Sequence, residues 1–471
     1  MTRHATYITV IAAACAALVS CFQPSFGEGG FLCQPGTDEL CPEGYQCCAS
    51  GVCRSDCSAT PDQGPAADKS PAVDARPDVG PKPDAKVPSC TDVKRVGAKL
   101  LGGPATSDLV LTSQDVPVVG YVEATRYPIV KRKTARTGDK WSGPVWYKGR
   151  ASMLDIALGK GDKLVALFSV KPSGGTGDGA LYFSDVATVW KAPVQLGEKD
   201  KRLWPGSAVL AGAASEADVF YLATAMTGPP TDPKPGVVFG RITPGAGTHK
   251  ELCRLESKAS TKGLYRHGRL AAARGSAKTH TALSYYADGS KKWGVAAQDD
   301  AATKCSYKVF PGSGAAVDGP LTLGVDAGGK VYLVHPKAGA KALASLQLST
   351  MDSAGATSAP KAITPAVNVD PASVSLAFNA AGRPCVSYAR AAKAGSKTLE
   401  VHVACQDKSG AFLETKTAVA SFTWDPAAAA YIGYPTSLAL DSKGDAHMIY
   451  QSPTAAGVSL QYTRCPSAIV P

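Results

Sequence analysis

PLTLGVDAGGKVYLVH, residues 320–335, consists of two short alternating segments joined by a glycine-containing turn. Apolar and polar residues alternate in each segment, and this period of two predicts half-buried antiparallel strands. The arrangement returns at residues 372–388 and again at residues 436–450. In each copy the turn glycine stands six residues before a large ring side chain (Gly329, Gly382 and Gly444). The chain therefore contains an internal repeat.

A third alternating strand follows each pair, so one repeat holds at least three strands. Looser copies come earlier in the chain, and the second strands begin near residues 116, 163, 218, 280, 330, 383 and 445. Repeats spaced by about 47 to 62 residues, each a small meander, are typical of the blades of a β-propeller. The sequence predicts an all-β fold with a seven-bladed propeller over residues 90–471. Six or eight blades stay open, because the first and third copies are weak.

The ring of a propeller must close, and the last repeat ends at Cys465 with only three strands. We expect residues 91–101, which precede the first repeat, to supply the missing outer strand of the last blade. Antiparallel pairing would then place Cys90 beside Cys465, so we predict a disulfide between them. Closing so long a loop contributes about 4 kcal/mol or more in the chain-entropy view.

Two further disulfides are predicted in the same region. Cys385 and Cys405 fall on the second and third strands of one repeat, where they can pair across strands. Cys253 and Cys305 pair by elimination. An even number of cysteines behind an export signal indicates disulfides formed in an oxidising compartment.

The N-terminus has the pattern of such a signal. Arg3 precedes an apolar run from Tyr7 to Val19, which is shorter than the roughly 20 residues needed to span a bilayer. The segment Leu18-Val19-Ser20-Cys21 resembles the lipobox of bacterial lipoproteins. This resemblance implies a signal peptide at residues 1–20, acylation of Cys21, and a membrane anchor of two or more acyl chains. The alternative is an ordinary secretory signal that leaves Cys21 for a disulfide.

The residue after Cys21 bears on which membrane the protein is anchored to. In bacterial lipoproteins an Asp at this position often marks retention in the inner membrane, and Phe22 stands there in this chain. The resemblance therefore implies an exported protein that is lipid-anchored to the cell envelope at the outer membrane.

Residues 21–57 are predicted to form a small disulfide-rich module, because so short a segment cannot bury a sufficient core. CPEGYQCCASGVC, residues 41–53, resembles knotted modules that follow the anchor in bacterial lipoproteins and, more loosely, hevein-like and Dickkopf-like domains. Hevein-like modules bind chitin oligosaccharides through several aromatics, whereas Tyr45 is the single aromatic within this cysteine span. A spacer or protein-contact role is favoured over sugar binding. The six cysteines, whose connectivity stays open, are Cys33, Cys41, Cys47, Cys48, Cys53 and Cys57.

Residues 58–89 are predicted to be a disordered linker. Pro recurs every few residues among Asp, Ala, Lys and Arg, a composition that favours extended polyproline-like chain. At about 3.1 Å per residue such a stalk reaches up to roughly 100 Å.

Charge is distributed unevenly along the chain. The whole chain carries +11, the signal contributes +1, residues 22–57 contribute −4 and the linker −1, which leaves about +15 on residues 90–471. A basic body attracts polyanions such as acidic polysaccharide. The alternative is a solvated basic surface, since only residues 131–133 and 199–202 are locally dense in cations. Nucleic acid is not an expected partner of a tethered, exported protein.

No catalytic constellation is present in the sequence. There is no nucleophile-elbow motif, P-loop or dinucleotide fingerprint, and the histidines never stand at HxH or HxxxH spacing, so neither cofactor nor metal is expected. Residues 286–293 and 176–183 come near the Asp-box of sialidase-like propellers but lose its spacing, and we interpret them as hairpin turns. The similarity to the sialidase-like and repeat-propeller class therefore carries no active-site residue across.

Ring side chains recur at the ends of the second strands, and packing between blades is favoured over a ligand-stacking ring (Tyr121, Phe168, Tyr285, Tyr388 and Tyr450). Propeller architecture by itself names no function. We favour a non-enzymatic surface protein whose propeller binds a protein or a glycan, with loops such as residues 224–236 forming the binding face. The alternative is an exported glycan hydrolase of the propeller type. Carboxylates and arginines clustered at the mouth of the ring would favour the enzyme, and an apolar or lysine-rich mouth the binder.

Overall fold

The structure is a computed structural model in which the chain forms two units, Met1–Pro83 and Asp84–Pro471. In the first unit it describes residues 46–47 and 53–54. In the second it describes residues 90–467 except 91–93, 102–105, 138–139, 171–179, 188, 197–202, 214, 228–233, 257–269, 276–277, 288–289, 300–304, 306–307, 310–320, 327, 338–343, 353, 364–365, 367, 392–395, 397, 424–435 and 455–456.

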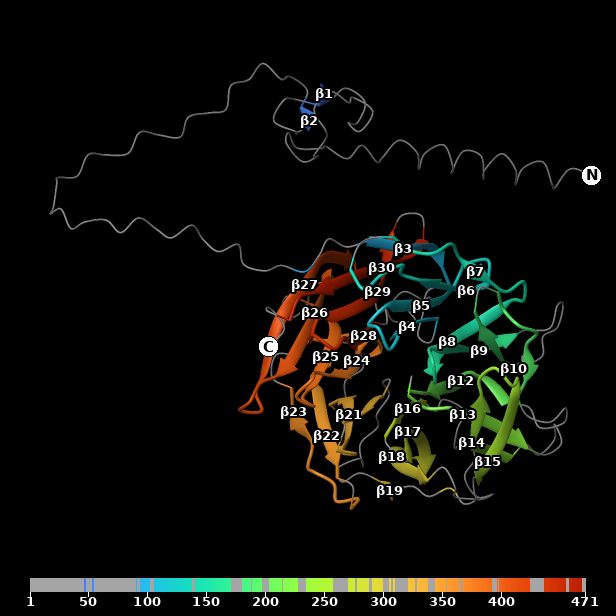
Figure 1. Cartoon of the computed structure of the whole chain (residues 1–471). Helices are drawn as coiled ribbons and strands as arrows, with labels where there is room; N and C mark the ends of the chain where they lie inside the picture. Colours follow the sequence, from blue (N-terminus) through green and yellow to red (C-terminus); the bar gives the residue numbers. More distant parts are fainter. Residues whose placement is uncertain are drawn as a thin grey trace, which may run out of the picture. The chain divides into compact units, whose positions relative to one another are not determined.

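The second unit is a seven-bladed β-propeller, as the repeats predict (Figure 1). Each blade is one four-stranded antiparallel sheet, and six of the seven take their strands in chain order. Blade 1 contains β4 (Ser107–Leu111), β5 (Pro117–Val122), β6 (Pro128–Arg132) and β7 (Val145–Trp146). Blade 2 contains β8 (Ala151–Gly159), β9 (Lys163–Val170), β10 (Ala180–Val186) and β11 (Val194–Gln195). Blade 3 contains β12 (Leu203–Ala211), β13 (Val219–Thr227), β14 (Lys234–Thr243) and β15 (Thr248–Glu256).

The remaining blades follow the same plan. Blade 4 contains β16 (Leu270–Arg274), β17 (Lys278–Ala287), β18 (Ser290–Asp299) and β19 (Lys308–Val309). Blade 5 contains β20 (Thr322–Val325), β21 (Val331–Pro336), β22 (Leu346–Met351) and β23 (Lys361–Ala362). Blade 6 contains β24 (Ser375–Phe378), β25 (Pro384–Ala391), β26 (Thr398–Gln406) and β27 (Phe412–Thr423), preceded by a 3-10 turn at Pro371–Ser373.

Blade 7 closes the ring with strands from both ends of the domain. It contains β28 (Thr436–Leu440), β29 (Ala446–Thr454), β30 (Gly457–Cys465) and, as its outer strand, β3 (Lys94–Leu100). β3 runs antiparallel to β30, with Lys94 opposite Tyr462. The disulfide Cys90–Cys465 joins the residues just outside this pairing. Closure therefore uses the segment and the cysteines that the sequence pointed to.

The turns between the first and second strands explain the spacing of the repeated glycines. In blade 5 the Asp326 carboxylate accepts hydrogen bonds from the backbone N–H groups of Gly328 (2.9 Å) and Lys330 (3.0 Å). Gly329 then takes a φ of +80°, a conformation that a β-carbon disfavours. Asn379 and Asp441 begin the same turn in blades 6 and 7. The repeated spacing therefore reflects one hairpin turn, which a side-chain oxygen and a glycine of positive φ stabilise.

Ring side chains fill the contacts between blades. The four whose burial is described are at most 2% exposed, and each packs against the preceding blade (Tyr121, Phe168, Tyr388 and Tyr450). Tyr450 of blade 7, for example, belongs to the same buried cluster as Val401 and Leu399 of blade 6. The predicted packing role is confirmed for these four, and the side chain of Tyr285 lies outside the described residues.

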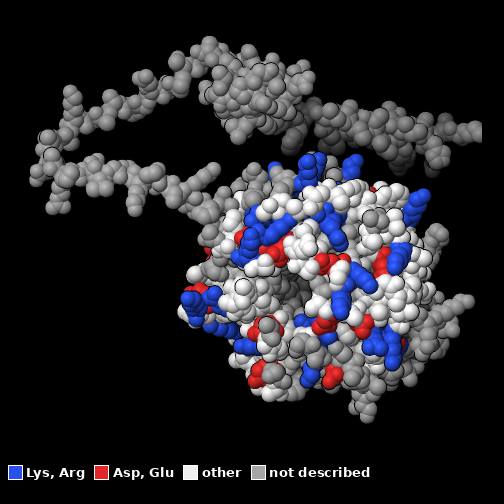
Figure 2. Space-filling view, in the orientation of Figure 1, with Lys and Arg blue, Asp and Glu red and all other residues white. Residues whose placement is uncertain are grey.

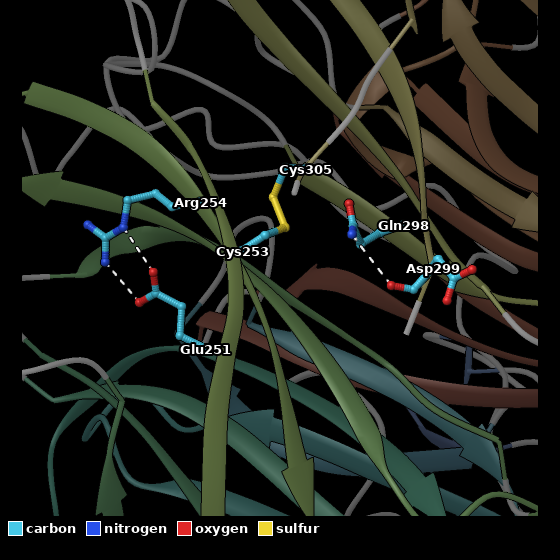
Figure 3. The surroundings of a disulfide bond; sticks show 6 residues. All are labelled: Glu251, Cys253, Arg254, Gln298, Asp299 and Cys305. Atoms are coloured by element: carbon cyan, nitrogen blue, oxygen red, sulfur yellow. Dashed lines mark hydrogen bonds and ion pairs between the residues drawn. A yellow bond between two sulfur atoms is a disulfide. The ribbon is translucent and has the colours of Figure 1, made fainter. Parts of the chain in front are cut away.

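Two disulfides besides the closing one are present. Cys385–Cys405 links directly opposed residues of β25 and β26 within blade 6. Cys253–Cys305 instead links β15 of blade 3 to blade 4, with the Arg254–Glu251 ion pair beside it (Figure 3). These are the same pairs that the sequence favoured.

One expectation about loops needs correction. Residues 224–236 were expected to form a long loop, but β13 and β14 continue into them, and Thr224 pairs with Val237. Backbone pairing extends the hairpin as far as Thr227 opposite Lys234. At the other predicted hairpin, Ala287 pairs with Ser290, so the strands on either side of the predicted turn are paired.

Most N-terminal predictions fall on residues that the structure does not describe: residues 1–20, Cys21, and the linker at 58–89. Within residues 21–57 it describes one strand pair, β1 (Gln46–Cys47) with β2 (Cys53–Arg54), and the connectivity of the six cysteines lies outside the description. Among the described residues, no helix has the length and apolar character needed to cross a membrane.

Candidate functional site: the central channel

The first strands of all seven blades line one central channel of about 740 Å³. These strands are β4, β8, β12, β16, β20, β24 and β28. Figure 2 shows this face of the ring hollowed at its centre, with acidic and basic side chains around the opening. Because the channel is the place where every repeat contributes equivalent residues, we take it as the candidate site.

One position of the repeat lies two to four residues before the last residue of each first strand and lines the channel. From blade 1 to blade 7 it is occupied by Asp108, Asp155, Val209, Ala271, Thr322, Ser375 and Ser437. Four of the polar members bond a backbone N–H of the next blade. Among them, Asp108 accepts from Ile156 (3.3 Å), Ser375 from Leu438 (3.0 Å) and Ser437 from Leu109 (3.2 Å).

Asp155 likewise accepts from the Leu210 N–H, and the Thr322 hydroxyl donates to the Val374 carbonyl. The polar side chains thus form a belt that ties neighbouring blades together. The belt is interrupted at blades 3 and 4, because the side chains of Val209 and Ala271 have no hydrogen-bonding group.

Asp108 and Asp155 form the most unusual pair in the channel, because their two buried carboxyl groups influence each other's pKa. Burial raises the pKa of Asp108. Burial, followed by the charge of Asp108, raises the pKa of Asp155 well above its ordinary value. Two carboxyls in contact cannot both ionise cheaply, so the pair holds a proton at a pH where isolated carboxyls have lost theirs. Such a pair is a potential proton donor facing the channel.

At the far end of the first strands, contacts among turns join neighbouring blades. Ser113 of blade 1 donates to the Asp162 carboxylate of blade 2 (2.8 Å), and Ser442 of blade 7 donates to Asp115 of blade 1. Arg274, which ends β16 and lines the channel, pairs with Glu216 of blade 3. The arginine and the carboxyl pair therefore lie at opposite ends of the channel wall and do not form one cluster.

A second polar network is buried between blades 7 and 1. His447 lies between the Asp441 carboxylate (Nε2 to Oδ2, 2.9 Å) and the Tyr462 hydroxyl (Nδ1 to Oη, 2.7 Å), and Lys133 approaches that hydroxyl (3.4 Å). Arg136 bonds Asp441 (Nε to Oδ2, 2.7 Å) from blade 1.

Burial lowers the pKa of His447 and outweighs the opposing effect of Asp441, which favours the neutral imidazole. His447 is 0% exposed, which keeps this network away from any substrate.

A Tyr–carboxylate–Arg grouping, of the types that a sialidase would need, occurs in blade 6. The Tyr388 hydroxyl donates to Glu414 (2.5 Å), and Arg390 pairs with the same carboxylate (2.8 Å). Tyr388 is 0% exposed and packs against blade 5. The grouping is absent from the channel lining, and its three residues all lie within blade 6. Nowhere in the described residues do three His, Cys, Asp or Glu side chains gather as metal ligands.

Sequence reasoning missed both the carboxyl pair and the buried network. The signal for the pair was available: aligning the first strands of the repeats puts Asp108 and Asp155 at one position. The network was harder to find, because Arg136 and Asp441 meet only through ring closure across 305 residues.

The chain is similar in fold to several solved propellers. A fungal alcohol oxidase of the AA5 family shares 12% identity at a TM-score of 0.48, covering 82% of this chain and 79% of that one. A PL25 ulvan lyase shares 10% identity at a TM-score of 0.47, covering 78% and 95%, and the endosialidase of phage phi92 shares 9% at 0.45, covering 80% and 69%. No protein-family model matches the sequence, and no curated protein is similar to it. These solved propellers carry no activity over to this chain.

Proposed function

We propose that this protein is an exported lipoprotein, anchored through Cys21, whose propeller binds a glycan without transforming it. The observation that supports the binding role is that the polar groups of the channel hydrogen-bond to neighbouring blades of the ring. Asp108 alone accepts bonds from two backbone N–H groups and from the Ser437 hydroxyl (3.0 Å). Because these bonds occupy its carboxylate, Asp108 has a structural role between blades and not a catalytic one.

The composition of the channel wall supports the same proposal. Small aliphatic residues of blades 3 and 4 form one side, including Ala208, Val209, Ala271 and Ala272. Neither a cluster of free carboxylates nor an arginine group gathers among the described channel residues. The strongly basic propeller supports an anionic ligand, because net charge attracts polyanions over distances of about a Debye length.

Anchoring can be tested separately from binding. Full-length protein expressed in a bacterium that is fed a labelled fatty acid should incorporate the label and sediment with membranes. The Cys21→Ser variant should lose both properties, whereas a Cys21→Ser variant that still sediments and incorporates label would contradict the anchor.

The binding role predicts that purified full-length protein retains acidic glycans unchanged. A panel of acidic and neutral polysaccharides should give saturable binding to the acidic members, measured by titration calorimetry, with no new reducing ends after prolonged incubation. Absence of binding to every acidic member would contradict the proposal.

The second candidate is a glycan hydrolase, and the Asp108–Asp155 pair is the observation that favours it. A protonated carboxyl beside an ionised one supplies the acid that glycosidic cleavage requires. If new reducing ends do form, Asp155→Asn should abolish them while leaving Asp326→Asn, in an exposed turn, fully active. That outcome would establish the enzyme in place of the binder.

A further inference from the structure

The densest run of positive charge in the chain lies in blade 1. Residues 124–150 contain eight Lys or Arg residues against a single acid, Asp139, and four aromatic residues are interspersed among them. Figure 2 shows basic side chains over the part of the ring that holds β3, β6 and β7.

Three of these eight cations are used inside the protein. Lys131 donates to the Val96 carbonyl (2.8 Å), Lys133 approaches the Tyr462 hydroxyl, and Arg136 pairs with Asp441 and Asp445. The other five make no ion pair in the described part of the chain: Arg126, Arg132, Lys140, Lys148 and Arg150. Their charge is available to a partner.

Backbone contacts bring several of the unpaired cations to one end of blade 1. The Ala151 N–H bonds the Arg126 carbonyl (2.6 Å), and the Tyr147 N–H bonds the Pro128 carbonyl (3.2 Å). The Ala124 N–H bonds the Lys99 carbonyl of β3 (2.6 Å), which adds a cation from the closing strand. We name the resulting surface the basic aromatic patch, made of Lys99, Arg126, Tyr127, Trp146, Lys148 and Arg150.

Trp146, the last residue of an outer strand, is 49% exposed. Its ring lies 6.0 Å from the Tyr127 ring, and the Lys148 Nζ lies 5.9 Å from its centroid. By contrast, Trp190 is largely covered and donates to the Val145 carbonyl (3.1 Å). An indole left half in solvent, beside unpaired cations, indicates a contact surface for a ligand.

We propose that the basic aromatic patch binds an acidic polysaccharide, with a sugar ring stacked on Trp146 and its carboxylate or sulfate groups paired with Arg126, Lys148 and Arg150. Guanidinium groups suit planar anions, and an indole face suits the C–H face of a pyranose ring. Nucleic acid shares both features, but the three disulfides of the propeller place this chain in an oxidising compartment. The inference rests on the proposed function, and names the surface and the ligand class.

The test is a calorimetric titration of full-length protein in a nonionic detergent with polygalacturonate. Neutral dextran and single-stranded DNA serve as probes of matched length. Wild-type protein should bind polygalacturonate with an affinity that falls as salt rises, and should bind dextran and DNA far more weakly. Trp146→Ala should weaken binding about tenfold, and Lys148→Glu combined with Arg150→Glu should weaken it by about tenfold or more.

Matched controls lie on blade 6. Leu413, 48% exposed, gives Leu413→Ala as the control for Trp146→Ala, and the exposed Lys408 gives Lys408→Glu. Both controls should bind within about twofold of wild type, and all variants should keep its thermal midpoint. If wild type binds but the patch variants bind equally well, the patch is wrong while the proposed function stands. If wild type binds no acidic polysaccharide, both are wrong, and DNA binding as tight as polygalacturonate would overturn the ligand class.

Discussion

Two regions of one ring are held together by different chemistry. From blade 7 to blade 2 the blades share polar contacts: the belt through Ser437, Asp108 and Asp155, and the buried network around His447. From blade 3 to blade 4 the belt position is apolar, and a disulfide, Cys253–Cys305, connects the two blades instead. Ring closure needs directional contacts that fix register, whereas consecutive blades are already joined by the chain.

Breaking the disulfides one at a time should give the largest and most clearly ordered effect. The bonds close 375, 52 and 20 residues of chain, in the order Cys90–Cys465, Cys253–Cys305 and Cys385–Cys405. Replacing each pair with alanine should lower the free energy of unfolding by about 6, 4 and 3 kcal/mol respectively in the chain-entropy view. Guanidinium denaturation followed by tryptophan fluorescence measures this ranking. Equal losses would show that the closing bond has no special role.

The buried network should come next in size. Asp441→Asn removes the charge opposite Arg136 and the acceptor of His447, and we expect it to cost about 3 kcal/mol of unfolding free energy. Asp326→Asn, at the same turn position in blade 5, should cost about 1 kcal/mol or less, because Asn379 already begins this turn in blade 6. Urea denaturation of both variants checks the difference. Similar losses at the two turns would mean that closure does not depend on the network.

The carboxyl pair should reveal itself through pH. Its raised pKa means that the folded state keeps a proton which the unfolded chain loses above its ordinary value of 3.8. Wild-type stability should therefore fall as pH rises from there until the pair loses that proton, by about 1.4 kcal/mol per unit of raised pKa. Asp155→Asn keeps the hydrogen bonds without this titration, so its stability relative to wild type should increase with pH. Thermal midpoints between pH 4 and 8 test this, and parallel curves would contradict it.

The belt itself should give the smallest effect. Ser437→Ala removes the acceptor of the Leu109 N–H and a donor to Asp108, and should cost about 1 kcal/mol. Ala271→Ser, at the equivalent position of blade 4, should change stability by less than about 0.5 kcal/mol, because Ala271 lines the channel and is only partly buried, so water can solvate the added hydroxyl. Chemical denaturation of both variants measures the difference in unfolding free energy. An equal loss at both positions would contradict the proposed difference between the two regions.

The repeat pattern was sufficient to predict the propeller, because each blade is a local unit whose strands and turn are encoded within a few dozen residues. Gly329 and its counterparts marked the turns, and Cys90 and Cys465 marked the closing strand. Side-chain meetings between blades were harder, since they depend on the register of one sheet against the next. Asp108 and Asp155 stand 47 residues apart, and although aligning the first strands puts them at one position, their approach depends on how the two blades pack. The basic aromatic patch could not be predicted for a similar reason. The cations at residues 131–133 were recognised in the sequence, but three of the eight cations of residues 124–150 bond other groups inside the protein.

Peptide mapping of the unreduced protein tests the closed ring most directly. Exported full-length protein, digested without reduction and examined by mass spectrometry, should yield a peptide pair joined through Cys90 and Cys465 and a second joined through Cys253 and Cys305. A Cys90 peptide attached to any other cysteine, or carrying a free thiol in folded protein, would contradict closure of the seventh blade by the N-terminal strand.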